Sequence, residues 1–260
     1  MKKKISAVQR RHQDYLRRKG LAVGQIYAKR LYSLRRKEVK RCLELCGSYD
    51  DATLWPRIFE NSFSEAGYLQ DWYSGLYLAA GIPQCASTIR DLKRKKASDA
   101  DASIGVFENA LKDYANRRCG SNIVSVSGTL RDELIDILNE ELTEDVNIGI
   151  EKFTKKVMKR FNPLATWQVR RIAQTETMIG LAEAGAMAAA DTEVRFLKEW
   201  CISGVGNTRD THMKMDGVTV GQDEYFVLED CRMLYPHDNS LNPPAGEIIN
   251  CACSCIRIPI

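Results

Sequence analysis

Apolar side chains recur at helical spacing over most of the first 160 residues. Trp55, Phe59 and Phe63 follow one another at intervals of four, which places them on one face of a helix. Two further apolar stripes run through residues 129–142 and 146–157, each with the three-to-four spacing of a helix. The pattern predicts a mainly helical region in which the aromatic residues form a core.

Three short stretches interrupt this helical pattern. Residues 93–103 change from basic to acidic and small, which is typical of an exposed turn. Residues 119–128 are rich in Ser and Gly and predict a hinge. Residues 161–163 (FNP) predict the end of a helix, because proline lacks the amide hydrogen that a helix needs. The alanine-rich residues 167–190 then predict a long, closely packed helix.

The pattern changes after Asp191. Residues 193–203 favour a strand, residues 204–207 (GVGN) favour a turn, and glycines and prolines separate short segments thereafter. We therefore expect an α+β protein, with a mainly helical N-terminal region followed by a small α+β C-terminal module. The expected division is a basic and helical N-terminal region, a helical segment leading into the module, and the module itself: 1–120, 121–190 and 191–260.

Composition narrows the classes of protein that remain. The chain has 260 residues, 44% of them hydrophobic, and no apolar run approaches the roughly 20 residues that span a bilayer. The basic start is not followed by an apolar segment, so we expect no signal peptide and no membrane partner. With no export signal, the nine cysteines are expected to be free thiols or metal ligands of a cytoplasmic protein.

Positive charge is concentrated at the start of the chain. Residues 1–41 hold fifteen Lys and Arg against two acidic residues, a net charge of +13, whereas the whole chain carries +4. Such a segment is either a solvated helix face or a surface that contacts nucleic acid or an acidic protein. The candidate contacts with nucleic acid or with a partner protein are Lys2, Lys3, Lys4, Arg10, Arg11, Arg17, Arg18, Lys19, Lys29, Arg30, Arg35, Arg36 and Lys37.

Histidine and cysteine gather in the last fifty residues. Thiolates and neutral imidazoles are the ligands that zinc prefers, and a Cys-x-Cys pair can supply two of them. The candidate ligands of a structural zinc ion are His212, Cys231, His237, Cys251 and Cys253. Alternatively, Cys251, Cys253 and Cys255 lie on one side of a final strand as small apolar residues. The Cys-x-Cys spacing excludes a Cys-x-x-Cys redox motif.

Residues 209–217 (RDTHMKMDG) offer a second chemistry. His212 with Asp216 could act as a general base or bind a catalytic metal, which with His237 and the cysteines would describe a metal-dependent hydrolase or nuclease. Alternatively, Asp216 and Gly217 form a turn while internal hydrogen bonds hold His212. No nucleophile elbow, phosphate-binding glycine loop or HExxH motif accompanies these residues, so the sequence favours the structural interpretation of His212.

Several segments occur in an order that resembles the phage Mu F-like minor head protein family, also called the phage head morphogenesis family. They are the helix RRIAQTETMIGLAEAGA, a tryptophan, RDTHMKMDG, a phenylalanine, YPHD and PAGEIINCACSC. The residues that carry the resemblance are Thr175, Glu176, Trp200, Arg209, His212, Asp216, Gly217, Phe226, Pro236, Asp238, Asn250, Cys251 and Cys253. The family commonly has Arg where this chain has Gln174 and Ala252.

The resemblance covers residues 165–255 and implies a non-catalytic virion protein. Family members are minor head proteins of tailed phages or prophages that bind the portal inside the procapsid. Expected partners are the portal protein, a scaffold or major capsid protein, and DNA during packaging or delivery. The expected location is inside the head near the portal vertex, after assembly in the host cytoplasm. Some members carry a toxin or nuclease domain after this module; none is expected here, so we expect no enzyme. A nucleic-acid-binding module without a phage role is a further alternative.

Overall fold

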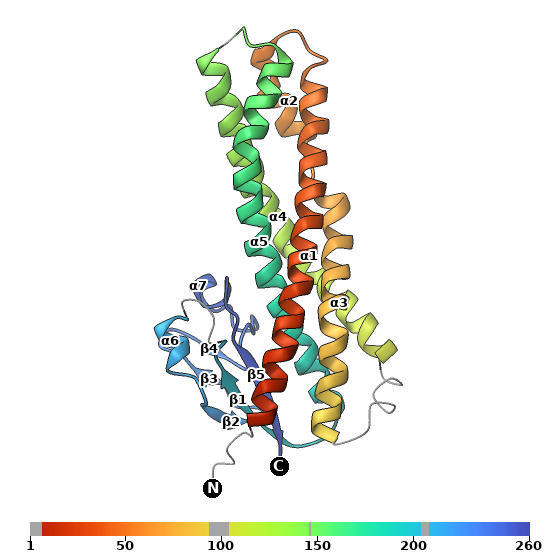
Figure 1. Ribbon diagram of the computed structural model, residues 1–260, viewed down its shortest axis with the longest axis vertical. Coiled ribbons are helices and arrows are strands. Elements are labelled where there is room, and N and C mark those ends of the chain that lie inside the picture. Colours follow the sequence, from red (N-terminus) through yellow and green to blue (C-terminus); the bar gives the residue numbers. More distant parts are fainter. Residues whose placement is uncertain (1–6, 94–103, 146, 204–207) are drawn as a thin grey trace. The chain divides into compact units, whose positions relative to one another are not determined.

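The computed structural model describes residues 7–93, 104–145, 147–203 and 208–260, and it confirms the α+β class. Helices α1 to α5 come first along the chain, and the strands follow with the short helices α6 and α7 among them (Figure 1). The helices are α1 (Ala7–Cys46), α2 (Trp55–Ser62), α3 (Ala66–Lys93), α4 (Ile104–Glu144), α5 (Ile150–Asp191), α6 (Asp210–Met213) and α7 (Ala245–Ile248), with a 3-10 turn at Ala52–Leu54. The strands are β1 (Phe196–Cys201), β2 (Thr219–Gly221), β3 (Phe226–Val227), β4 (Arg232–Met233) and β5 (Ser254–Pro259).

The chain forms two compact units that do not follow the three consecutive segments expected from the sequence. Unit 1 contains residues 1–25, 74–114 and 171–260, and unit 2 contains residues 26–73 and 115–170. The boundaries fall inside α1, α3, α4 and α5, because each of these long helices contributes one stretch to each unit. The units therefore depend on packing between distant segments and not on linkers in the sequence.

Unit 2 is built around the aromatic residues that the periodicity selected. Phe59 is fully buried, Trp55 and Phe63 are nearly so, and the Trp55 and Phe153 rings lie 4.9 Å apart between centroids. Leucines of α4 and apolar residues of α1 and α5 complete this core. The predicted core role of these aromatic residues is confirmed.

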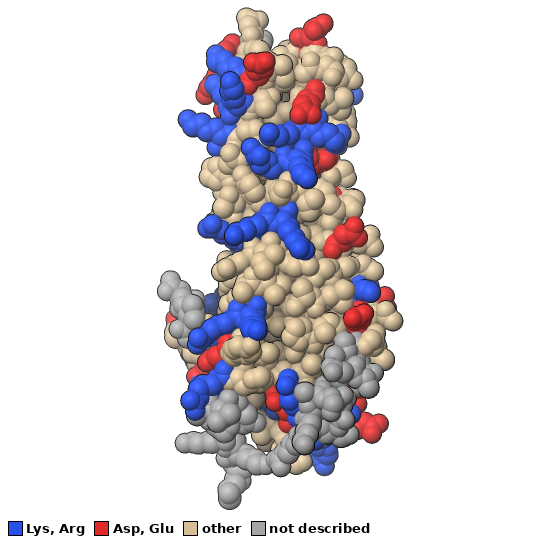
Figure 2. Space-filling model, turned by 45° about the vertical axis from the view of Figure 1, so that its right-hand side comes forward, with Lys and Arg blue, Asp and Glu red and all other residues tan. Residues whose placement is uncertain are grey.

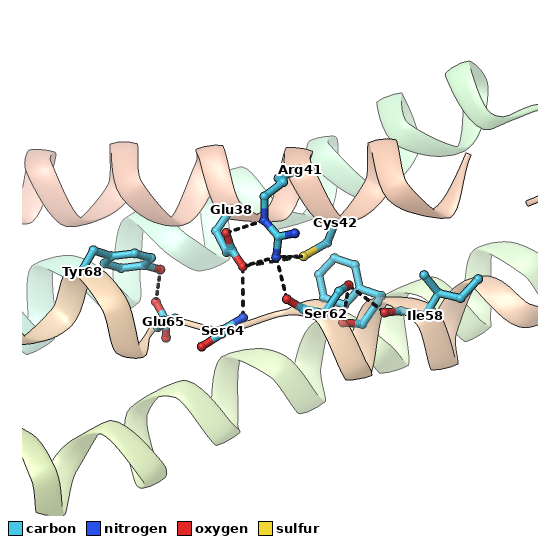
Figure 3. A network of polar contacts seen from close by, with 9 residues as sticks. Glu38, Arg41, Cys42, Ile58, Ser62, Ser64, Glu65 and Tyr68 are labelled. Carbon is cyan, nitrogen blue, oxygen red and sulfur yellow. Dashed lines mark hydrogen bonds and ion pairs between the residues drawn. The ribbon is translucent and has the colours of Figure 1, made fainter. Parts of the chain in front are cut away.

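A polar network fastens α1 to the connection between α2 and α3 within unit 2 (Figure 3). The Glu38 carboxylate accepts hydrogen bonds from the Arg41 guanidinium and from the Ser64 N–H, at 2.7 and 3.1 Å. Arg41 also donates to the Ser62 carbonyl. Burial opposes ionisation of Glu38, but these hydrogen bonds outweigh it and hold its pKa below the ordinary value. The network satisfies the polar groups at the end of α2.

Two predicted breaks in the helices are wrong. Helix α4 runs without interruption through the expected hinge at residues 119–128, where Gly and Ser cost a helix only about 0.5–1 kcal/mol each. Helix α5 likewise continues past Pro163, since Phe161 and Ala165 on either side are fully buried in the core. The predicted turn at residues 93–103 lies outside the described residues apart from Lys93, which ends α3. The predicted turn at residues 204–207 lies outside them as well.

Unit 1 combines an antiparallel sheet with stretches of long helices. The strand order is β2-β1-β5, and β1 pairs with β5 from Phe196 opposite Pro259 to Cys201 opposite Ser254. Strands β3 and β4 form a separate two-stranded ladder. The strand predicted within residues 193–203 is therefore confirmed as β1.

The alanine-rich stretch of α5 packs closely, as predicted. Ala184 and Ala188 are fully buried beside Cys85 of α3. A Cβ added at Gly24 of α1 would lie 2.6 Å from the Thr177 hydroxyl, so the two helices approach at a position that a larger residue would disturb. None of the described helices is both long and apolar enough to cross a membrane.

Candidate metal centre

The Asn-Cys-x-Cys run lies in the short connection between α7 and β5. Asn250 has a φ of 58° there, and its backbone N–H donates to the Thr175 hydroxyl of α5 at 3.0 Å. The Arg209 guanidinium donates to the neighbouring Ile249 carbonyl at 2.5 Å. These bonds hold the connection against α5 on one side and against the start of α6 on the other.

This connection brings two cysteines to the ring of His212 in α6. The His212 Nδ1 atom lies 3.4 Å from the Cys251 Sγ atom and 3.5 Å from the Cys253 Sγ atom. All three side chains are buried, with 1–3% of their surface exposed. Within the described residues, they form the one group of three His, Cys, Asp or Glu side chains whose ligand atoms all lie within 4.8 Å of each other.

The opposite edge of the His212 ring faces a carboxylate. The Nε2 atom lies 2.7 Å from the Glu247 Oε2 atom, and the Thr211 hydroxyl donates to the same oxygen at 3.2 Å. The Trp200 ring packs edge-on against the imidazole, with 5.2 Å between centroids. The Nε2 contact with Glu247 is close in distance but is not aligned as a hydrogen bond. The carboxylate and the Trp200 ring therefore border the imidazole, and its Nδ1 atom lies on the side of the sulfurs.

Hydrogen bonds make one of the two thiols acidic. The Cys253 side chain and backbone N–H donate to the Cys251 sulfur, which lowers the pKa of Cys251 in spite of its burial. The same side-chain hydrogen bond, together with burial, raises the pKa of Cys253. The pKa values of the two thiols are therefore shifted in opposite directions, with the Cys251 thiol the more acidic of the pair.

The other candidate ligands lie outside this group. Cys231 and His237 do not bring a donor atom into it. The Asp216 carboxylate instead accepts a hydrogen bond from the Ile202 N–H and pairs with Arg10, both at 3.2 Å. Asp216 and Gly217 form the expected turn, with Gly217 at a φ of 77°. The three-donor set is therefore smaller than the five residues that the sequence suggested.

The terminal cysteines do not share one strand face as the alternative expected. Cys255 lies in β5 opposite Trp200, but Cys251 and Cys253 precede the strand. Proximity to His212 distinguishes these two from Cys255. Glu247 was not singled out from the sequence, since a lone carboxylate in the PAGEIINCACSC run carries no metal-ligand spacing.

The remaining residues of the resemblance have structural roles in the same unit. Asp238 accepts hydrogen bonds from the Leu234 and Ser240 backbone N–H groups at 2.8 and 2.9 Å, which closes the turn at Pro236. Glu176 accepts a 2.7 Å hydrogen bond from the Tyr77 hydroxyl inside the helices.

The basic segment is only partly available for binding, and two of its predicted contacts are corrected. Arg35 is fully buried and Arg17 is 4% exposed, so neither can reach a phosphate. Arg10 pairs with Glu199 and Asp216. Lys2, Lys3 and Lys4 lie outside the described residues. Besides Arg10, the exposed candidates are Arg11, Arg18, Lys19, Lys29, Arg30, Arg36 and Lys37.

Comparisons with protein-family models, with curated proteins and with solved structures each found no match for this chain.

Proposed function

We propose that the chain is a non-catalytic minor head protein of a tailed phage or prophage that binds the portal during head assembly. The proposal rests on the resemblance of residues 165–255 to that family. One structural observation supports it: residues of the resemblance that lie far apart in the sequence pack together in unit 1. Asn250 bonds to Thr175, His212 faces Cys251 and Cys253, and Trp200 packs on His212.

The contacts of these residues favour a structural role over catalysis. A hydrolase built on His212 would use Asp216 and His237 beside the metal, but Asp216 is held by Arg10 and the Ile202 N–H, and His237 lies outside the donor group. Arg209 and Asp238 are likewise directed at backbone groups. Such residues stabilise a small module that could serve as a docking unit.

The first test is binding to the portal protein encoded by the same phage or prophage genome. Co-expressed with that portal, the full chain is expected to co-elute in size-exclusion chromatography, with a portal from an unrelated phage as the control. Purified virions are also expected to contain the chain, protected from protease until the heads are opened. No complex with the portal and no chain in the virions would contradict the proposal.

DNA is the second proposed partner, through the exposed face of α1. Lys29 and Arg36, and likewise Arg30 and Lys37, are seven residues apart, so each pair lies on one side of the helix two turns apart. Figure 2 shows several groups of Lys and Arg side chains on the face turned toward the viewer. Exposed cations at this spacing suit contacts with phosphates along a duplex.

Replacing two of these lysines should weaken DNA binding in a salt-dependent way. For Lys29→Gln/Lys37→Gln, we expect the slope of log affinity against log salt to fall in magnitude by about 2, since each lost phosphate contact removes about 0.9. Lys155→Gln/Lys159→Gln removes two exposed lysines from α5 and is the matched control. Fluorescence anisotropy with a duplex at several salt concentrations measures the slope. An equal change in both variants would remove α1 as the specific contact.

A further inference from the structure

We propose that His212, Cys251 and Cys253 bind one zinc ion, with Glu247 orienting the histidine from behind. The proposal concerns this site alone and does not depend on the role in head assembly. It replaces the five candidate ligands from the sequence with three and adds a residue that the sequence did not indicate.

The distances from the imidazole to the two sulfurs are close to those that a bound ion requires, and the two sulfurs lie within 4.8 Å of each other. Zinc bonds to nitrogen at about 2.0–2.1 Å and to sulfur at about 2.3 Å, so a tetrahedral ion separates such ligands by about 3.6 Å. The observed separations from His212 Nδ1 to the two sulfurs are 3.4 and 3.5 Å. The three donors therefore stand where an ion could bind all of them with little movement.

Two features outside the donor set are typical of zinc ligation. A histidine that binds zinc through one nitrogen usually presents the other to a carboxylate, and Glu247 lies 2.7 Å from Nε2. The Cys253 backbone N–H donates to the Cys251 sulfur at 3.4 Å, which stabilises a thiolate. Zinc binds cysteine as the thiolate and histidine as the neutral imidazole, so binding would release the protons that these groups carry.

Other buried cysteines of the same unit show what packing alone produces. The Cys85 sulfur donates to the Ala184 carbonyl beside apolar neighbours, and the Cys255 sulfur donates to the Ile256 carbonyl. Neither belongs to the group of ligand atoms around His212. Cys251 and Cys253 differ from these two cysteines, because their sulfurs and the His212 Nδ1 atom place three metal-binding atoms close together.

The ion would join parts of the module that are distant in the sequence. His212 belongs to α6, and the cysteines lie 39 and 41 residues later, before β5. Within the described residues the group supplies three donors. Zinc binding would then stabilise the connection that also contacts Thr175.

Metal analysis of the intact chain tests the site. The protein is purified under reducing conditions without a chelator or a histidine tag, and its zinc content is measured by mass spectrometry. We expect one zinc per chain, and after exchange for Co²⁺ we expect a sulfur-to-cobalt charge-transfer band with the visible bands of a tetrahedral ion. Substoichiometric zinc after zinc addition, with no sulfur band from Co²⁺, would overturn the proposal.

Single substitutions then identify the ligands. Cys253→Ser is expected to lose the ion or the charge-transfer intensity of one sulfur, whereas Cys255→Ser, a buried cysteine two residues away, keeps both. Glu247→Gln leaves the three donors in place and is expected to weaken zinc affinity by about 10–100-fold. Zinc affinity that is unchanged in Cys253→Ser, or lost equally in Cys255→Ser, would refute this ligand set. Circular dichroism of each variant checks that it is folded.

Discussion

Replacing Arg35 with methionine is expected to lower the free energy of unfolding by about 3–5 kcal/mol, because it leaves a buried charge without a partner. The guanidinium and the Glu65 carboxylate are both fully buried and form two hydrogen bonds, at 2.7 and 3.1 Å. Arg35 also donates to Gln168, and Tyr68 donates to Glu65 at 2.7 Å. The network thus joins α1, α3 and α5 within unit 2.

Urea unfolding followed by circular dichroism measures the loss, and Arg36→Met is the matched control. Arg36 is the exposed neighbour of Arg35, so the same substitution there should change stability by no more than about 0.5 kcal/mol. Removing both charges in Arg35→Met/Glu65→Met is expected to recover much of the loss, because no unpaired charge remains. Equal effects at positions 35 and 36 would show that the buried pair is not formed.

Replacing Trp200 with alanine is expected to cost about 3–5 kcal/mol, the range for removing a buried tryptophan. The side chain is fully buried in β1 and packs edge-on against His212 and Phe226, with centroids 5.2 and 5.3 Å away. Its removal would leave a cavity beside the His212 imidazole, and the imidazole would lose the packing contact with the Trp200 ring. We therefore expect this variant to weaken zinc binding as well as stability.

The matched control is Trp167→Ala. Trp167 is 56% exposed, and the same substitution there should change stability by no more than about 0.5 kcal/mol. Thermal and urea unfolding of both variants, each with and without added zinc, measures the two effects. A loss at position 200 no larger than at position 167 would mean that the core around the imidazole is not packed as described.

Much of the local structure could be predicted from the residues alone. The four-residue spacing of Trp55, Phe59 and Phe63 selected a buried helix face, and the composition of residues 193–203 selected β1. Such patterns are readable because helical and strand periodicity are properties of neighbouring residues. The Cys-x-Cys pair also directed attention to Cys251 and Cys253.

Helix continuity and side-chain burial depend on contacts between residues that are distant in the chain, so only the tertiary structure decided them. Pro163 remains inside α5 because the packing of its buried neighbours outweighs its weak local preference for helix. Arg17 and Arg35 look like their exposed neighbours in the sequence, yet burial removes them from any binding surface.

For the candidate metal site, too, some features could be predicted from the sequence and others depended on the fold. Sequence by itself determined that histidine and cysteine would be concentrated near the end of the chain. Only the fold selected His212, Cys251 and Cys253 from among them and placed Glu247 behind the ring. The physical reason is that ligand geometry depends on distances of a few ångströms between α6 and the connection before β5, which lie about forty residues apart in the sequence.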